Sequence, residues 1–238
     1  MTDSLVSRFG LGSSELIAVV GAGGKTTTVQ RIGAELAADG DRVILTTTTK
    51  MSEGQLSEPV CWTADASTLD ASFVAGRPLY AATEVTDGKV IGFSPETVDD
   101  LFSSTSADHV IVEADGARRM LIKAPAAYEP VIPSTSTVAI VVVGARALGQ
   151  PIGAVAHRPD RIRALTGLDE TDILDPESAA AILLHPDGGL KAIPEGARVV
   201  MTIANVTPDT QNAAASLAAL LDAHPRIDRT AQMQQSAF

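Results

Sequence analysis

The segment that most constrains the fold joins a short apolar run to a helical pattern through a glycine-rich turn. Residues 16–20 read LIAVV, residues 21–28 read GAGGKTTT, and apolar side chains then repeat at helical spacing through residue 36. Strand, glycine-rich turn, Lys-Thr and helix together form the layout of a phosphate-binding loop. The usual spacing would place a glycine where Val19 stands, so this loop is shorter than the standard one.

Each part of the segment predicts a contact with a nucleotide. The loop amides are expected to surround the phosphates, because glycine tolerates positive φ and lets successive N–H groups turn inward; the loop residues are Gly21, Ala22, Gly23 and Gly24. We expect Lys25 to bind the β and γ phosphates, Thr26 to bind Mg²⁺ and Thr27 to bind an α-phosphate oxygen. We also expect Lys25 to be poorly packed and to point into an empty site. The alternative is a tight turn between strand and helix that binds nothing.

A second motif, VIVEADG at residues 110–116, is an apolar strand that ends in carboxylates. Glu113 and Asp115 lie two residues apart, so in a strand they project from the same face. The carboxyl edge of an open α/β sheet is where ligands bind. We expect one carboxylate to hold Mg²⁺ through water and the other to polarise a nucleophile, so both are candidate catalytic residues. The alternative is a solvated strand end with an Asp-Gly turn.

Other polar segments follow predicted strands at the same edge. In LTTTTKM (residues 45–51), Thr48 and Lys50 are candidates for sensing the γ-phosphate or Mg²⁺, although threonines are also good strand formers. Basic side chains in later loops could bind phosphate or an anionic substrate: Arg118, Arg119, Lys123, His157 and Arg158. An ordinary surface loop with solvated charges is the alternative for Arg118, Arg119 and Lys123. His157 could be a general base or simply a residue at a helix start.

Composition excludes several classes of protein. The net charge of the 238-residue chain is −11, from 29 acidic and 18 basic residues, which argues against non-specific binding to nucleic acid or anionic membrane. A single cysteine and scattered histidines predict neither a disulfide nor a thiolate metal site. No apolar run has membrane-spanning length and no signal-peptide pattern opens the chain, so we expect a cytoplasmic protein. An acidic, lysine-poor chain also suggests a salt-adapted source.

Periodicity predicts an α/β fold. Buried strands are expected at residues 16–20, 42–45, 109–112, 138–143 and 199–203. Helices are expected at residues 26–38, 95–102, 159–165, 176–184 and 208–223. Residues 78–93 contain two strand-like runs around Asp87-Gly88, which predicts a β-hairpin inserted between the second and third core strands. The sum is one doubly wound domain over residues 1–238, with a mainly parallel sheet of the P-loop NTPase type.

With these segments in place, the chain resembles the YqeC-type accessory proteins of selenium-dependent molybdenum hydroxylases. The resemblance rests on the joint order of GAGGKTTT, LTTTTKM, VEADGARRMLIKAP, YEPVIP, GARALGQP and AHRPDRI. It implies a P-loop protein that binds a nucleotide and serves selenium-cofactor biosynthesis or a molybdenum hydroxylase. The loop is also similar to the GTNGKTT loop of Mur-type amide ligases. Residues 203–207 read IANVT and lack the lysine and aspartate of the guanine-selecting motif that the family is expected to carry, so ATP is favoured over GTP.

Together these patterns predict Mg²⁺-dependent nucleotide binding, with slow hydrolysis or phosphoryl or nucleotidyl transfer in the maturation of a hydroxylase cofactor. Two alternatives stay open. One is a non-catalytic module that senses nucleotide and delivers a cofactor intermediate to a partner. The other is an ATP-dependent ligase acting through an acyl phosphate. Such a ligase needs a second substrate domain, for which this chain is short.

Overall fold

A computed structural model describes residues 4–56 and 60–235 of the chain. The helices are α1 (Leu5–Phe9), α2 (Lys25–Ala38), α3 (Ala66–Ser72), α4 (Pro95–Ser104), α5 (Ile152–Val155), α6 (Pro159–Thr166), α7 (Pro176–Leu183) and α8 (Gln211–Asp222), with short 3₁₀ turns at Glu53–Gln55 and Ala145–Ala147. The ends of the expected domain, residues 1–3 and 236–238, lie outside the described residues, and its extent over 1–238 stays a prediction.

Eight strands form the central sheet in the order β13-β12-β10-β1-β8-β2-β5-β4, and each pair of neighbours is parallel. Their bounds are β1 Glu15–Gly21, β2 Val43–Thr47, β4 Val60–Cys61, β5 Leu79–Ala81, β8 His109–Glu113, β10 Val138–Gly144, β12 Arg198–Val206 and β13 Arg229–Gln234. The central strands are buried on both faces, which is why they read as continuous apolar runs. The mainly parallel α/β architecture predicted from the sequence is confirmed.

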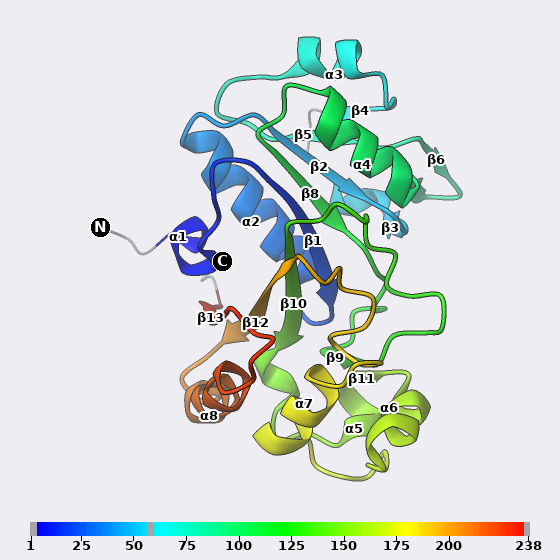
Figure 1. Ribbon diagram of the computed structural model, residues 1–238. Coiled ribbons are helices and arrows are strands. Elements are labelled where there is room, and N and C mark those ends of the chain that lie inside the picture. The colour runs from blue at the N-terminus through cyan, green and yellow to red at the C-terminus, as the bar shows by residue number, and fades with distance from the viewer. Residues whose placement is uncertain (1–3, 57–59, 236–238) are drawn as a thin grey trace.

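Helices cover both faces of this sheet (Figure 1). On one face, α1 and α2 pack against Ile17, Val19 and Ile140. On the other face, α3 and α4 cover the half that contains β8, β2 and β5, while α7 and α8 cover β10 and β12. The strand β1 therefore lies at the centre of the sheet, between β8 and β10, with the two halves of the molecule on either side of it.

The hairpin is present but shorter than expected. Its strands are β6 (Glu84–Thr86) and β7 (Lys89–Ile91), joined through Asp87 and Gly88, both at positive φ. The strand β3 (Lys50–Ser52) pairs with β7 and completes a small antiparallel sheet. Residues 79–81 do not belong to the hairpin, because they form β5 and pair in parallel with β2. A further two-stranded parallel pair joins β9 (Ile122–Lys123) to β11 (Ala156–His157).

Candidate functional site

The loop between β1 and α2 lies tightly against the neighbouring strand β10. The amide of Ala22 donates to the carbonyl oxygen of Val142 at 2.8 Å. Gly21 and Gly23 have positive φ, and a Cβ atom at Gly21 would lie 2.2 Å from the same carbonyl oxygen. Only glycine fits this position, because any side chain would collide with the backbone of β10.

The loop and the start of α2 contain unpaired backbone amides. In the described part of the chain, the backbone N–H groups of residues 23–27 find no acceptor, and the first amide of the segment to do so is that of Thr28, which donates to Gly24 at 2.9 Å. These groups lie at the start of the 14-residue helix α2, where the helix dipole is positive. Such a row of amides attracts an anion.

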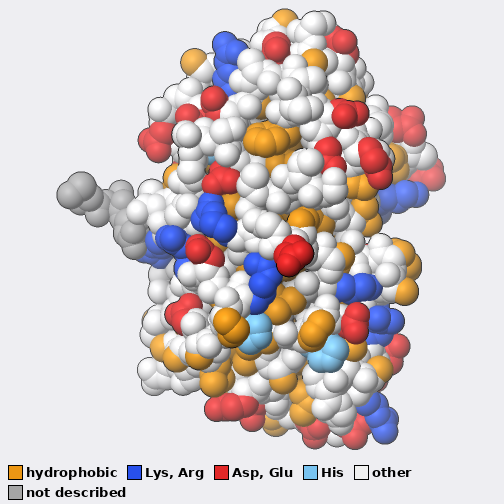
Figure 2. Space-filling model, in the orientation of Figure 1, with side chains coloured by type: hydrophobic (Ala, Val, Ile, Leu, Met, Phe, Trp, Pro, Cys, Tyr) orange, Lys and Arg blue, Asp and Glu red, His pale blue; other side chains and the backbone are white. Residues whose placement is uncertain are grey.

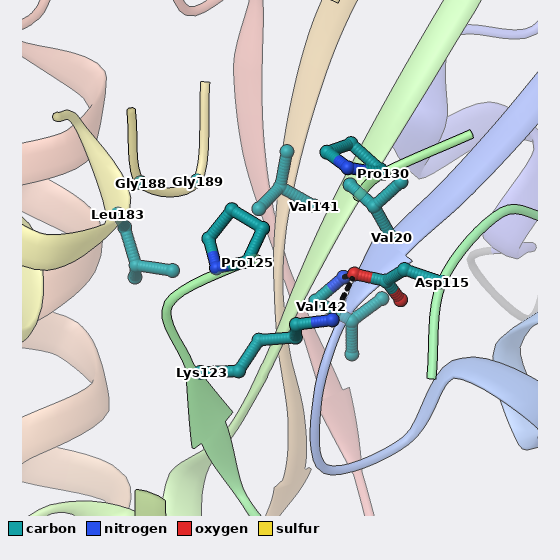
Figure 3. Close-up of a pocket in the computed structure, with 11 residues that line it drawn as sticks. Val20, Asp115, Lys123, Pro125, Pro130, Val141, Val142, Leu183, Gly188 and Gly189 are labelled. Carbon is teal, nitrogen blue, oxygen red and sulfur yellow. Dashed lines mark hydrogen bonds and ion pairs between the residues drawn. The ribbon is translucent and has the colours of Figure 1, made fainter. Parts of the chain in front are cut away.

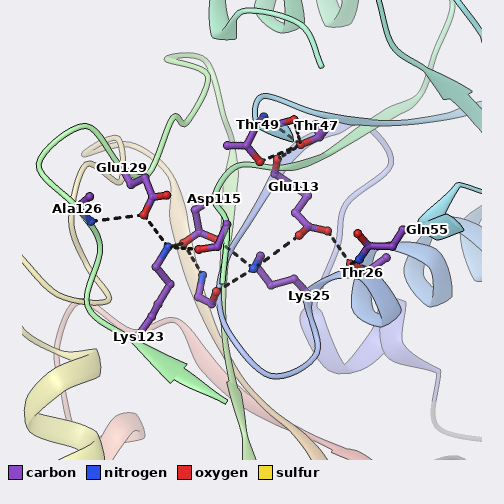
Figure 4. Close-up of polar contacts among 12 residues, drawn as sticks. Lys25, Thr26, Thr47, Thr49, Gln55, Glu113, Asp115, Lys123, Ala126 and Glu129 are labelled. Atoms are coloured by element: carbon purple, nitrogen blue, oxygen red, sulfur yellow. Dashed lines mark hydrogen bonds and ion pairs between the residues drawn. The ribbon is translucent and has the colours of Figure 1, made fainter. Parts of the chain in front are cut away.

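Lys25 is buried at the first position of α2 and is paired with both carboxylates of the acidic strand end. Its Nζ atom lies 3.2 Å from Asp115 Oδ1 and 3.6 Å from Glu113 Oε1, and it donates to the carbonyl oxygen of Gly21 at 2.9 Å (Figure 4). The side chain is 5 % exposed. The expectation that Lys25 is poorly packed is therefore wrong, because the two carboxylates hold its ammonium inside the site.

Glu113 also contacts the hydroxyl expected to bind metal. Thr26 Oγ1 donates to Glu113 Oε2 at 2.9 Å and accepts from Gln55 Nε2 at 2.8 Å. Burial raises the pKa of Glu113, while the positive charge of Lys25 opposes that increase. The carboxylate of Glu113 thus depends on its cationic neighbour to stay ionised.

Asp115 links Lys25 to a second buried lysine, Lys123. Its Oδ2 atom accepts from the Gly21 amide at 3.0 Å and lies 2.9 Å from Lys123 Nζ. Lys123 in turn lies 2.9 Å from Glu129 Oε2, which is 2.7 Å from Arg158 Nη1. We call this series of alternating charges the ionic chain; its members are Glu113, Lys25, Asp115, Lys123, Glu129 and Arg158.

The carboxyl group of Glu129 has a strongly lowered pKa. Burial alone would raise its pKa, but the hydrogen bonds and charges of Arg158 and Lys123 outweigh burial and hold the pKa at about 2. Burial is the largest cause of the lowered pKa of His157, and the positive charges of Arg158 and Lys123 lower it further. His157 is therefore favoured as a neutral imidazole.

The structure does not bring every candidate residue to the ionic chain. The Thr48 hydroxyl donates to the carbonyl oxygen of Val131 at 2.7 Å, and Lys50 is exposed on β3. Thr27 is exposed on α2 beside the unpaired amides. Arg118 and Arg119 are exposed next to the site and both have positive φ, an uncommon state for two consecutive arginines.

Three residues with site contacts were not among the candidates from sequence. Glu129 joins Lys123 to Arg158, Gln55 reaches Thr26, and Asn205 Nδ2 donates to the carbonyl oxygen of Gly23 at 2.9 Å. The YEPVIP segment contained a signal for Glu129, since it places a carboxylate among basic residues in the same region. Asn205 lies in the IANVT segment, whose sequence shows no sign of a contact with the glycine-rich loop.

The oxygen groups near Lys25 fit a magnesium ion better than a metal that needs a protein cage. The described residues hold no cluster of three or more His, Cys, Asp or Glu side chains that could bind a metal by themselves. Mg²⁺ is commonly held by one or two carboxylates together with substrate phosphates and water. Asp115 Oδ1 is buried and accepts no hydrogen bond in the described structure, although Lys25 Nζ lies 3.2 Å away, so it could serve a metal once that ammonium moves to a phosphate.

A small cavity of about 20 Å³ adjoins the Asp115–Lys123 pair (Figure 3). Val20, Pro125, Pro130 and Leu183 form most of its apolar wall. This volume is sufficient for about one water molecule, which would have polar partners only on the side of the ion pair. The cavity therefore belongs to the buried surroundings of the ionic chain and does not accommodate a substrate.

The surface agrees with the acidic composition. On the face shown in Figure 2, acidic side chains are spread widely and basic ones are interspersed among them. Among the described residues, no helix combines the length and the apolar character that crossing a membrane requires.

The fold and the glycine-rich turn define an α/β protein with a fold of the P-loop NTPase type. The family model described as "YqeC protein" matches residues 17–160. The chain is also 36% identical over 191 residues to a protein of Escherichia coli (strain K12) named "Uncharacterized protein YqeC", an alignment that covers 79% of this chain and 75% of the relative. The chain belongs to the YqeC family.

Proposed function

We propose that this protein binds a nucleoside triphosphate with Mg²⁺ at the loop of residues 21–28, with ATP favoured over GTP. The observation that carries the proposal is that the unpaired amides of residues 23–27 occur together with Lys25 and two carboxylates at the start of α2. Amides and an ammonium are suited to phosphate oxygens, and carboxylates are suited to a cation bound to those phosphates. A turn that binds nothing has no need of this combination.

The proposed roles follow from an exchange of partners. Phosphate oxygens would replace Glu113 and Asp115 at the Lys25 ammonium, because both kinds of oxygen compete for one cation. The freed carboxylates and the Thr26 hydroxyl would then hold Mg²⁺ directly or through water. When bound, Mg²⁺ supplies neutralisation of charge on the β and γ phosphates. Lys25 orients the phosphates, and one of the carboxylates orients the attacking group.

We further propose slow hydrolysis, or phosphoryl or nucleotidyl transfer, in the maturation of a molybdenum or selenium hydroxylase cofactor. The support for this role is the resemblance carried by the sequence motifs. The second candidate is a nucleotide-sensing module that delivers a cofactor intermediate to a hydroxylase or its maturation proteins. The ionic chain favours it, because a change at Lys25 would reach Arg158 at the edge of the site through direct contacts.

Thermal unfolding with Mg²⁺ and ATP, GTP or CTP tests nucleotide binding. Ligand at 100 times its dissociation constant adds about 2.7 kcal/mol to the free energy of unfolding. For a chain of this length the melting temperature should rise by roughly 5–10 °C. The absence of any shift at saturating nucleotide would contradict the proposal.

Phosphate release measured on Asp115→Asn and Glu113→Gln separates the enzyme from the sensing module. We expect Asp115→Asn to lower kcat by at least about 100-fold, with a similar or smaller effect for Glu113→Gln. Nucleotide affinity without Mg²⁺ should change little or rise slightly, because the carboxylates act mainly when charge develops during transfer and their removal takes negative charge away from the phosphates. Wild-type turnover in both variants would contradict their catalytic role, and binding without any turnover in the wild type would favour the sensing module.

A further inference from the structure

Positive charge is concentrated at the Arg158 end of the ionic chain. Lys123 and Arg158 meet there on the carboxylate of Glu129, at 2.9 Å and 2.7 Å; Lys123 and Glu129 face one another in Figure 4. His157 is the register partner of Lys123 on the parallel strands β11 and β9. The chain as a whole has a net charge of −11, so this region differs from the rest of the molecule in the sign of its charge.

Lys191 and Arg161 bring two more cations to this region. Lys191 Nζ donates to the carbonyl oxygen of Ala126, whose amide donates to Glu129 Oε2 at 3.4 Å. Burial is the largest cause of the lowered pKa of Lys191, and the positive charge of Arg161 lowers it further, while Asp187 opposes that decrease. Arg161 and Lys191 therefore lie within electrostatic reach of one another. Neither forms an ion pair with a carboxylate among the described residues.

Arg118 reaches the same region from the loop between β8 and β9. The carbonyl oxygen of Gly116 in this loop accepts from Lys123 Nζ at 2.6 Å. Arg118 is exposed, has a φ of 47° and forms no ion pair within the described part of the chain. Its charge contributes to the lowered pKa of His157, after the larger effects of burial and of Arg158.

The loop between β8 and β9 also borders the glycine-rich turn. A Cβ atom at Gly23 would lie 2.8 Å from the carbonyl oxygen of Leu121. Lys123, just beyond Leu121, lies 2.9 Å from Asp115, and Asp115 lies 3.2 Å from Lys25 Nζ. A ligand group held among the cations would therefore lie beside the phosphates of a nucleotide bound at the turn.

The charge balance of the region fits an anionic ligand. Glu129 serves two of the cations, which leaves Arg118, Arg161 and Lys191 without a carboxylate at ion-pair distance among the described residues. Arg161 Nε is also buried and has no acceptor there. Guanidinium groups match the oxygens of a phosphate in geometry and charge. We propose that Arg118, Arg161 and Lys191 bind a dianionic oxyanion of phosphate type on a second substrate, beside the nucleotide. That the ligand is a second substrate rests on the proposed function.

Calorimetric titration with inorganic phosphate tests the inference, at constant ionic strength and about pH 8, above the second phosphate pKa of about 6. Arg118→Ala and Arg161→Ala each remove one of the cations. Arg118 is exposed, so its variant leaves the core untouched. The matched control is Arg163→Ala on α6, because the Arg163 side chain is 68 % exposed and is paired with Asp169. Each titration is repeated with Mg²⁺ and saturating β,γ-imido ATP, which would occupy the glycine-rich turn.

We expect the wild type to bind phosphate in both titrations. Arg118→Ala and Arg161→Ala should each weaken phosphate binding by about 10-fold or more, because a hydrogen bond to a charged group contributes on this scale. Arg163→Ala should match the wild type. No phosphate binding by the wild type, unchanged affinity in either test variant, or an equal loss in Arg163→Ala would overturn the inference.

Addition of the ATP analogue separates the anion site from the turn. Loss of phosphate binding when the analogue is present would place the phosphate at the turn and would also overturn the inference. Failure of the analogue itself to bind would contradict the proposed function instead. The arginine variants would then still decide whether the anion site exists, so the two failures are distinguishable.

Discussion

Lys25 combines a structural contact with the proposed binding role. Its buried ammonium lies between Asp115 and Glu113; without it, Asp115 would keep Lys123 as a partner, whereas Glu113 would have no cation within ion-pair distance among the described residues. Without ligand, the lysine of the proposed phosphate-binding loop is therefore paired with the carboxylates that are proposed to bind Mg²⁺. Removal of the lysine must affect both the unliganded protein and the complex.

We predict that Lys25→Ala lowers the free energy of unfolding by about 3 kcal/mol without ligand, because one half of a buried ion pair is lost. The same variant should show no rise in melting temperature with Mg²⁺ and ATP. Denaturant unfolding and thermal unfolding measure the two effects. Lys89→Ala, at an exposed lysine of β7, is the control and should behave as the wild type. An unliganded Lys25→Ala protein as stable as the wild type would show that the ion pairs contribute nothing.

Glu129 gives the site a defined pH dependence. Its pKa is about 2 in the folded protein against an ordinary value of 4.5, so the folded state favours the carboxylate. The corresponding stability is present above pH 4.5 and is lost as the pH falls toward about 2. Glu129→Gln removes it at every pH and leaves Lys123 and Arg158 without their shared counter-charge.

We therefore predict that Glu129→Gln is about 3 kcal/mol less stable than the wild type near pH 7. The difference should shrink as the pH is lowered through the range from 4.5 toward about 2, because protonation then removes the same charge from the wild type. Urea unfolding at a series of pH values measures this. A difference that stays constant over the whole range would show that the carboxylate charge of Glu129 is not what stabilises the fold.

At the scale of elements, the sequence predicts the centre of the molecule better than its edges. The strands β1, β8, β10 and β12 are buried on both faces and therefore read as apolar runs. The edge strand β13 reads RTAQMQ, in which polar and apolar side chains alternate without a run, so it was not predicted. Residues 79–81 were assigned to the hairpin because the Asp87-Gly88 signal is local, whereas their pairing with β2 is not.

The residues of the site also divide into those that the sequence predicts and those that it does not. Lys25, Thr26, Glu113 and Asp115 were predictable because each directly continues a recognisable strand or begins a helix. Glu129 and Asn205 were not, since their contacts depend on how long loops return to the sheet edge. Residue type and spacing do not carry that information, which comes from packing.

The glycine-rich turn packs directly against the backbone of β10, so adding a single methyl group to the turn should disrupt this contact. Gly21→Ala would place Cβ 2.2 Å from the Val142 carbonyl oxygen, in a backbone conformation with φ +96° that alanine rarely adopts. We predict that the substitution lowers the free energy of unfolding by about 3 kcal/mol and abolishes nucleotide binding. Gly196→Ala is the control, because its Cβ would meet nothing within 4 Å. Wild-type stability in Gly21→Ala would mean that the loop can move away from β10.

At the scale of the whole molecule, charge is distributed in two different ways. The chain as a whole has a net charge of −11, so its surface repels itself. The ionic chain instead balances carboxylates with cations inside the protein, where salt screens poorly. Changes in ionic strength should therefore act mainly on the repulsion between surface charges.

We predict that the melting temperature rises when NaCl is increased from about 0.01 M to about 1 M, because the Debye length falls from about 30 Å to about 3 Å. Differential scanning calorimetry at constant pH measures the change. KCl at the same concentrations is the control, because it gives the same Debye length and should produce the same change. A melting temperature that falls with salt would indicate that attractive surface pairs outweigh the repulsion.

The central position of β1 has a consequence for how the protein forms during synthesis. Gly21 pairs in register with Val142, and the Ala22 amide is held by the same residue, more than a hundred positions later in the chain. A nascent polypeptide that has emerged only through β8 lacks this support, so the loop cannot take its final shape until β10 leaves the ribosome. Because contacts of such long sequence separation form late, capture of a nucleotide would report that β10 has paired with β1, and shorter nascent chains would be unable to compete for it.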